Sequence, residues 1–163
     1  SDQWVLEIEQ SDPRHALSGM DVARKVAILG REMGLPLELS EVRVESLVPA
    51  ELRSGTLEEF MANLHQEDGV MEERRRRAQA EGEVLRFVGS IDHEGRATAT
   101  LRSYPVEHPF ARIQLTDNIV LFRTRRYAEN PLIVQGPGAG PDVTAGGVFA
   151  DLLRLAAYLG API

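Results

Sequence analysis

The chain has 163 residues, a formal charge of −7, and apolar and charged fractions of 43% and 26%. These fractions are close to those of average globular proteins, which excludes bulk disorder and collagen-like order. No cysteine is present, which excludes disulfides, thiolate zinc sites and cysteine nucleophiles. The negative charge argues against a nucleic-acid binder, and no apolar run approaches the roughly 20 residues of a membrane-spanning helix. We therefore expect a globular domain, with the cytoplasm as the default compartment.

The first third of the chain predicts a long amphipathic helix followed by a strand. Asp12-Pro13 is typical of a turn. We expect the helix to have Ser18 as its N-cap and to end at Gly34. Residues 42–47 alternate apolar and charged side chains, which predicts a half-buried strand. The apolar face of the helix is predicted from helical spacing to consist of Val22, Val26, Leu29 and Met33.

The rest of the chain predicts further helices and four more strands. A Thr56–Glu59 capping box opens a helix that reaches about Leu64. Residues 67–81 predict a polar helix, whose arginine run 74–77 is typical of a solvated face. The predicted strands are 84–88 and 97–101, joined as a hairpin, then 118–123 and 132–134.

The last predicted element is a helix over 143–159. Its expected apolar face consists of Val148, Leu152, Leu155 and Leu159. Together the elements predict an α+β fold with a mostly antiparallel or mixed sheet of about five strands and helices packed on one face.

Asp21 and Lys25 are the first candidates for chemistry. They lie one helical turn apart, so their side chains project from the same helix face, beside the apolar stripe. Lys25 is also the only lysine among 18 basic residues. The spacing is typical of an ordinary surface ion pair. The alternative is a dry cleft in which the lysine can give up a proton and Asp21 positions a substrate.

A glycine-rich loop over residues 136–144 is the second candidate. Glycines let the backbone approach a ligand closely, and a helix N-terminus directs amide groups toward negative charge. The loop does not match the G-x-G-x-x-G motif, because Pro141 follows Gly140. Ligand contact and a structural turn capped by Asp142 both remain open. The four histidines show no metal-ligand spacing.

Three tracts of the sequence resemble the homoserine dehydrogenase family. The tracts are Asp12-Pro13-Arg14 with 17–25, His108-Pro109-Phe110-Ala111 with Thr116-Asp117-Asn118, and 136–151. In that family they correspond to the substrate site, a loop-and-strand segment, and the cofactor-facing loop and helix. The resemblance extends roughly over residues 9–160, and residues 43–50 look most like the versions fused to an aspartate kinase.

The resemblance implies NAD(P)-dependent interconversion of L-homoserine and L-aspartate 4-semialdehyde, on the route to threonine and methionine. It implies that Lys25 transfers the proton and that Asp21 holds the substrate. Gln10 corresponds to another substrate-binding position, and Gly140 to the cofactor contact, with Thr144 nearby. A homodimer formed through the sheet is also implied. The cytoplasm as the default compartment, and the expectation of no nucleic-acid or membrane partner, follow from the composition instead.

The chain departs from the family at the substrate site. The family tract reads Glu-Pro-Asp-Pro-Arg-Asp-Asp-Leu, whereas this chain has Gln10, His15 and Ala16 at the first Glu and the last two Asp positions. Glutamine keeps an acceptor oxygen but lacks the charge that would pair with a substrate ammonium. An alternative function is therefore a catalytically degraded assembly or regulatory module with the same fold. A third is a generic anion-binding module that uses residues 136–144.

The resemblance also implies a longer protein. Homoserine dehydrogenases begin with a dinucleotide-binding domain, and nothing here precedes Ser1 to supply one. We expect residues 1–163 to form the catalytic, substrate and dimerisation domain, with the helix over 143–159 packing toward the dinucleotide-binding domain. We expect the isolated chain to be inactive.

Overall fold

The computed structural model describes residues 12–114 and 117–160, which belong to two compact units, residues 1–106 and 107–163. The α+β class is confirmed. The five strands do not form one sheet as predicted, because they pair as a three-stranded and a two-stranded sheet. No helix among the described residues is long and apolar enough to cross a membrane.

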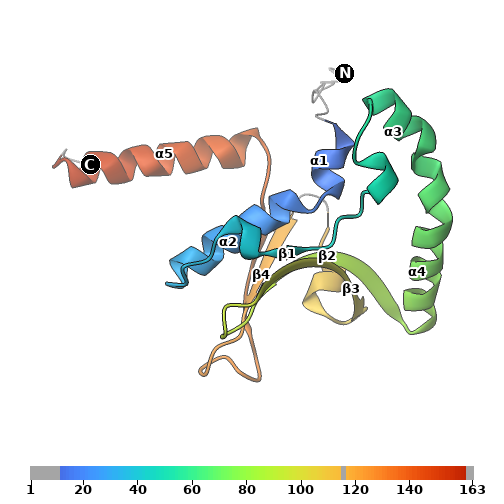
Figure 1. Cartoon of the computed structure of the whole chain (residues 1–163). Coiled ribbons are helices and arrows are strands. Elements are labelled where there is room, and N and C mark those ends of the chain that lie inside the picture. The colour runs from blue at the N-terminus through green and yellow to red at the C-terminus, as the bar shows by residue number, and fades with distance from the viewer. Residues whose placement is uncertain (1–11, 115–116, 161–163) are drawn as a thin grey trace, which may run out of the picture. The chain divides into compact units, whose positions relative to one another are not determined.

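The first unit builds helices around the three-stranded sheet. Its α-helices are α1 (Pro13–Leu17), α2 (Met20–Glu32), α3 (Leu57–Asn63) and α4 (Asp68–Ala80), and its 3-10 helices are η1 (Leu39–Glu41), η2 (Ala50–Leu52) and η3 (Leu64–Glu67). Its strands are β1 (Arg43–Val44), β2 (Glu83–Ile91) and β3 (Ala97–Pro105). The central strand β3 pairs in parallel with β1 and antiparallel with β2. Helix α2 packs on β2 and β3, and α4 packs beside β2 (Figure 1).

Helix α2 buries only part of the predicted face: Val26 is buried and Val22 packs against the core, as predicted. Leu29 and Met33 are exposed, and the buried residues of the helix are Ala23, Val26, Ala27 and Gly30. The helix buries small residues because it approaches the sheet closely. The Val26 side chain occupies the space that a Cβ at Gly89 would need. Apolar spacing alone does not reveal how close two elements come, so it placed Leu29 and Met33 in the buried face although they are exposed.

The start of α2 also differs from the prediction. Gly19, not Ser18, is the N-cap, and its φ of 76° lies in the left-handed region that favours glycine. A Cβ at this position would lie 2.5 Å from Phe87 Cζ. Ser18 instead ends α1, while its Oγ accepts a weak 3.3 Å hydrogen bond from Met20 N. Asp12-Pro13, predicted as a turn, is the start of α1, because Asp12 caps the helix and Pro13 takes its first position.

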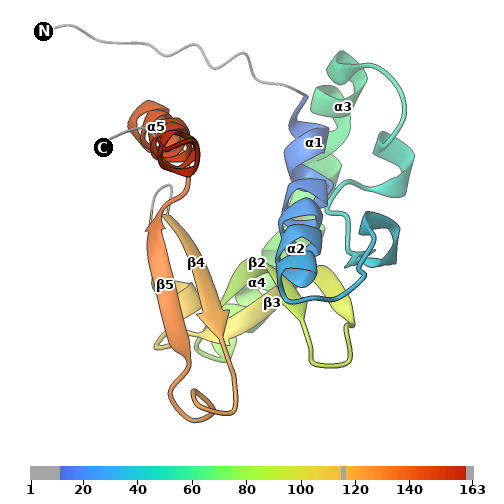
Figure 2. The same ribbon diagram turned by 90° about the vertical axis from the view of Figure 1, so that its left-hand side faces the viewer.

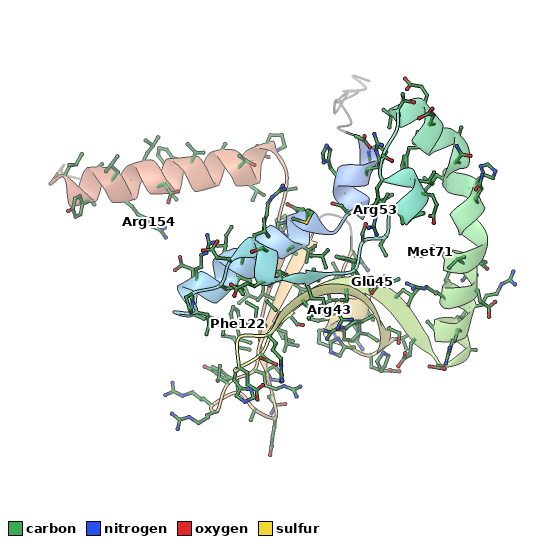
Figure 3. The ribbon with its side chains drawn as sticks, viewed as in Figure 1. Arg43, Glu45, Arg53, Met71, Phe122 and Arg154 are labelled. Carbon is green, nitrogen blue, oxygen red and sulfur yellow. The ribbon has the colours of Figure 1, made fainter. Side chains whose placement is uncertain are left out.

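Strand β1 is shorter than the predicted 42–47. Its pairing continues only to the hydrogen bond from Glu45 N to Ala99 O, at 2.9 Å. Beyond that point the Glu45 carboxylate accepts from Leu101 N at 3.2 Å, in place of a backbone carbonyl. Glu45 lies just past the end of β1 (Figure 3). A side chain therefore takes over the next amide of β3 and the strand ends there.

Helices α3 and α4 confirm their predictions. In the capping box, Thr56 Oγ1 accepts a hydrogen bond from Glu59 N at 3.2 Å, and Glu59 Oε2 accepts one from Thr56 N at 2.8 Å. The predicted solvated face of α4 is also confirmed. Arg75 and Arg76 both donate to the Glu72 carboxylate, at 2.7 and 2.9 Å. These hydrogen bonds, the Arg75 contact first, lower the pKa of Glu72 to about 2.

The second unit consists of η4 (Pro109–Arg112), β4 (Asp117–Phe122), β5 (Leu132–Pro137) and α5 (Pro141–Tyr158). Strands β4 and β5 form an antiparallel hairpin, and α5 follows β5 (Figure 2). None of the described residues of this unit is buried. The four residues predicted for the apolar face of the last helix, Val148, Leu152, Leu155 and Leu159, are all exposed, the last of them just after α5 ends. Arg154 on the same helix is exposed as well (Figure 3).

Candidate functional site

The predicted pair on α2 is formed. Lys25 Nζ lies 2.9 Å from Asp21 Oδ2. Both residues follow from the local helix, because positions i and i+4 lie one above the other on the same face. The aspartate lies in the first turn of α2, where a negative charge also interacts favourably with the helix dipole. The ion pair keeps the Lys25 ammonium next to the Asp21 carboxylate, beside the buried residues of α2.

The surroundings of this pair are wet within the first unit. The side chains of Lys25 and Asp21 are 56% and 65% exposed. The first unit does contain a groove of about 260 Å³, but it lies between α4 and the sheet and neither residue lines it. The described residues of the first unit therefore do not by themselves supply the dry cleft that the functional interpretation requires.

Asp12 and Arg14, part of the family tract, make a structural connection. Arg14 binds the Asp12 carboxylate with two nitrogens, donates to Gly55 O at 3.0 Å, and lies over the Phe60 ring at 5.6 Å. The hydrogen bond from the Arg14 side chain holds the pKa of Asp12 below its usual range, and the carboxylate in turn raises the pKa of Arg14. These two residues tie α1 to α3 and thereby fix the entry to α2.

Three other residues of the substrate-site tract are Gln10, His15 and Ala16. Gln10 lies outside the described residues. His15 and Ala16 both lie on α1 and are exposed. Of the predicted substrate-site residues, the structure thus brings together Asp21 and Lys25.

The glycine loop joins β5 to α5 within the second unit. Gly140 is the N-cap of α5 and has a φ of 130°, which side chains avoid. Its carbonyl accepts the first helical hydrogen bond, from Thr144 N at 3.0 Å. Among the described residues, apart from the two chain neighbours, no atom lies within 4 Å of the place a Cβ would take at Gly140 or at Gly136. Asp142, the alternative cap, lies inside the first turn instead. A side chain would therefore have room at both Gly136 and Gly140, and at Gly140 the backbone conformation is what requires glycine.

Gly138, between them, is glycine for a different reason. Its φ is ordinary, but a Cβ there would overlap the side-chain amide of Asn118, with Oδ1 at 3.0 Å. Asn118 lies on β4 opposite Gly136. Sequence reasoning quoted Asn118 for the family resemblance but did not connect it with the loop. The only signal was the strand pairing, which brings the start of β4 to the end of β5.

In the part of the chain that the structure describes, no group of three His, Asp or Glu side chains could hold a metal ion. His108 has a structural role instead, because its Nδ1 accepts from Phe110 N at 3.1 Å and caps η4.

Comparison with known proteins identifies the chain's relatives. The homoserine dehydrogenase family profile matches residues 4–153. The chloroplastic bifunctional aspartokinase/homoserine dehydrogenase 2 of Arabidopsis thaliana is 55% identical over 155 residues, which cover 94% of this chain and 17% of that protein. The homoserine dehydrogenase of Paracoccidioides brasiliensis is 47% identical over 92% of this chain and 41% of its own length. The chain thus spans less than half the length of these relatives.

Two solved structures have a similar fold. A Candida auris protein described as of unknown function has a TM-score of 0.85 and 42% identity, covering 93% of this chain and 43% of that one. The Staphylococcus aureus homoserine dehydrogenase at pH 7.5 has a TM-score of 0.67 over 94% of this chain and 34% of that one, and at 20% identity it supports the fold alone. The family match over residues 4–153 is decisive, and the chain belongs to the homoserine dehydrogenase family.

Proposed function

We propose that this chain is the substrate-binding and catalytic portion of an NAD(P)-dependent enzyme that interconverts L-homoserine and L-aspartate 4-semialdehyde in threonine and methionine biosynthesis. The observation that carries the proposal is the Asp21–Lys25 pair, formed at 2.9 Å on α2 in a chain of this family. Lysine suits proton transfer because its flexible stem lets the amine reach a reacting oxygen.

In the proposed reaction, the neutral amine of Lys25 accepts the hydroxyl proton of homoserine. The alcohol carbon loses a hydride, so the C–O single bond becomes the aldehyde double bond. In the reverse direction the ammonium of Lys25 returns the proton to the oxygen. Asp21 pairs with the lysine, and we propose that it also contacts the substrate, as the family resemblance implies. An acid one turn away keeps the amine oriented while the proton moves.

The loop residues fit a dinucleotide. Backbone around Gly136 and Gly140 is open, and the N-terminus of α5 provides amide groups that favour phosphate. We propose that Gly140, with Thr144 beside it, contacts NAD(P), which when bound accepts or returns the hydride. Most of the cofactor would be held by a dinucleotide-binding domain elsewhere in the protein.

That further domain has a second task in the proposal. Lys25 is more than half exposed here, and a water-free setting is needed for efficient proton transfer to a bound alcohol. Closure of the dinucleotide-binding domain over α2 would supply it. Residues 1–163 would then act as the catalytic, substrate and dimerisation part, alone inactive. A fused aspartate kinase is a further proposed neighbour, since several relatives are named as such fusions.

A homodimer through the sheet is proposed for the same protein, with the cytoplasm as its compartment. Support for the dimer comes from the second unit, none of whose described residues is buried. Its strands expose apolar side chains that a partner would cover, namely Phe122, Leu132, Ile133 and Val134. Light scattering of the complete protein should give twice the chain mass, and a monomer at micromolar concentration would overturn the dimer.

A catalytically degraded module is the second candidate, favoured by Gln10 and Ala16. The deciding experiment measures homoserine-dependent formation of reduced NAD and NADP by the complete protein and by residues 1–163 alone. The proposal expects turnover by the complete protein and none by the isolated chain. No turnover with either cofactor in the complete protein would favour the degraded module, and equal rates would refute the need for a second domain.

A further inference from the structure

The contact between Asn118 and Gly138 carries an inference about how the glycine loop is held. The two residues come from neighbouring strands of the hairpin, since Asn118 lies on β4 opposite Gly136 and Gly138 comes directly after β5. The carboxamide of Asn118 fills the space in which any other residue at position 138 would carry its Cβ. Real Cβ atoms do not approach other atoms so closely, so either the loop or Asn118 would have to move.

The ends of the loop are held by the pairing of Gly136 and Pro137 with β4 and by the hydrogen bond from Thr144 N to Gly140 O, and its middle has fewer contacts. Apart from their chain neighbours, no described residue has an atom within 4 Å of the Cβ position of Gly136 or Gly140, and no described residue of the second unit is buried. Among the described residues, Asn118 is thus the side chain that crowds a Cβ position in this loop, the one at Gly138. Asn118 makes no side-chain hydrogen bond within the described part of the chain, so packing against Gly138 is what the structure gives it to do.

We propose that Asn118 is the positioning residue of the glycine loop. By lying across Gly138 it fixes the backbone that leads to Gly140 and to the first turn of α5. The inference rests on the proposed function, because the ligand of the loop is taken to be NAD(P). It predicts that positions 118 and 138 are coupled: an alanine at 138 is harmful only while the asparagine is present.

A double-mutant cycle in the complete protein tests the coupling. The variants are Asn118→Ala, Gly138→Ala and the double substitution, and the readouts are KM for NAD(P), KM for homoserine, and kcat. Gly138→Ala should raise the KM for NAD(P) by about as much as Asn118→Ala does, because the Asn118 carboxamide ends a flexible side chain that the new Cβ displaces from the loop. In the Asn118→Ala background the same glycine substitution should change that KM by less than about twofold, because the space is then free.

Asn118→Ala alone should also raise the KM for NAD(P), while the KM for homoserine stays within about twofold. Gln135→Ala is the matched control. It removes a carboxamide from the same hairpin, one that donates to Asp117 Oδ2 at 3.0 Å and is not among the atoms that crowd the Cβ position of Gly138. A general loss of stability would affect both hairpin variants and both KM values.

The outcomes separate the two proposals. If the wild-type protein does not oxidise homoserine, the proposed function fails. If it does, and Gly138→Ala is equally harmful with and without Asn118, or Asn118→Ala leaves the KM for NAD(P) unchanged, the positioning role is refuted while the proposed function stands.

Discussion

Replacing Lys25 should separate catalysis from stability. The lysine pairs with Asp21 on the surface of α2, with 56% and 65% of the two side chains exposed. Exposed pairs at this spacing contribute only about 0.3–0.5 kcal/mol, so Lys25→Ala should change the free energy of unfolding by no more than that. General acid–base groups contribute about 10²–10⁴-fold to rate, so kcat for homoserine oxidation should fall by that factor.

Two further variants sharpen the test. Lys25→Arg keeps the positive charge and can keep the ion pair with Asp21, but a guanidinium does not release its proton, so it should be as inactive as Lys25→Ala. Arg24→Ala removes a neighbouring exposed basic side chain from the same helix and should leave kcat within about twofold. Urea unfolding and initial rates would be measured on all variants of the complete protein. A Lys25→Arg enzyme with a near-normal rate would refute proton transfer by this residue.

Three other predictions concern the stability of the folded chain. Phe60 is 1% exposed, so Phe60→Ala should cost about 3–5 kcal/mol in urea unfolding, and a loss no larger than that of the exposed Met61→Ala would contradict this. The pKa of Glu72 is lowered from 4.5 to about 2, chiefly by its hydrogen bond from Arg75, so its stabilisation is complete above pH 4.5 and lost as the pH falls toward 2. Glu72→Gln should therefore flatten the fall of the urea midpoint in that range, and parallel curves would argue against the pair. Gly140→Ala should destabilise by about 1–3 kcal/mol through backbone strain alone, because no atom is near enough to clash, and an unchanged melting temperature would show that the loop has another conformation.

Local patterns predicted the elements that depend on neighbours in sequence. The capping box at Thr56 and Glu59, the stop at Gly34 and the hairpin of β2 and β3 all follow from interactions a few residues apart. The same holds for Asp21 and Lys25, since any helix brings positions i and i+4 together.

The tertiary structure decided what depends on distance between elements. The close approach of α2 to β2 selected Ala23 and Gly30 for burial instead of Leu29 and Met33. The amide of Leu101, taken by the Glu45 side chain, ended β1 early. The pairing of β4 with β5 placed Asn118 against Gly138. The sequence by itself determined most of the elements and the ion pair of Asp21 with Lys25, because those arise from short-range geometry. Which faces are buried, how the strands divide into sheets, and what holds the glycine loop depend on contacts between residues far apart in the chain, and only the folded structure contains them.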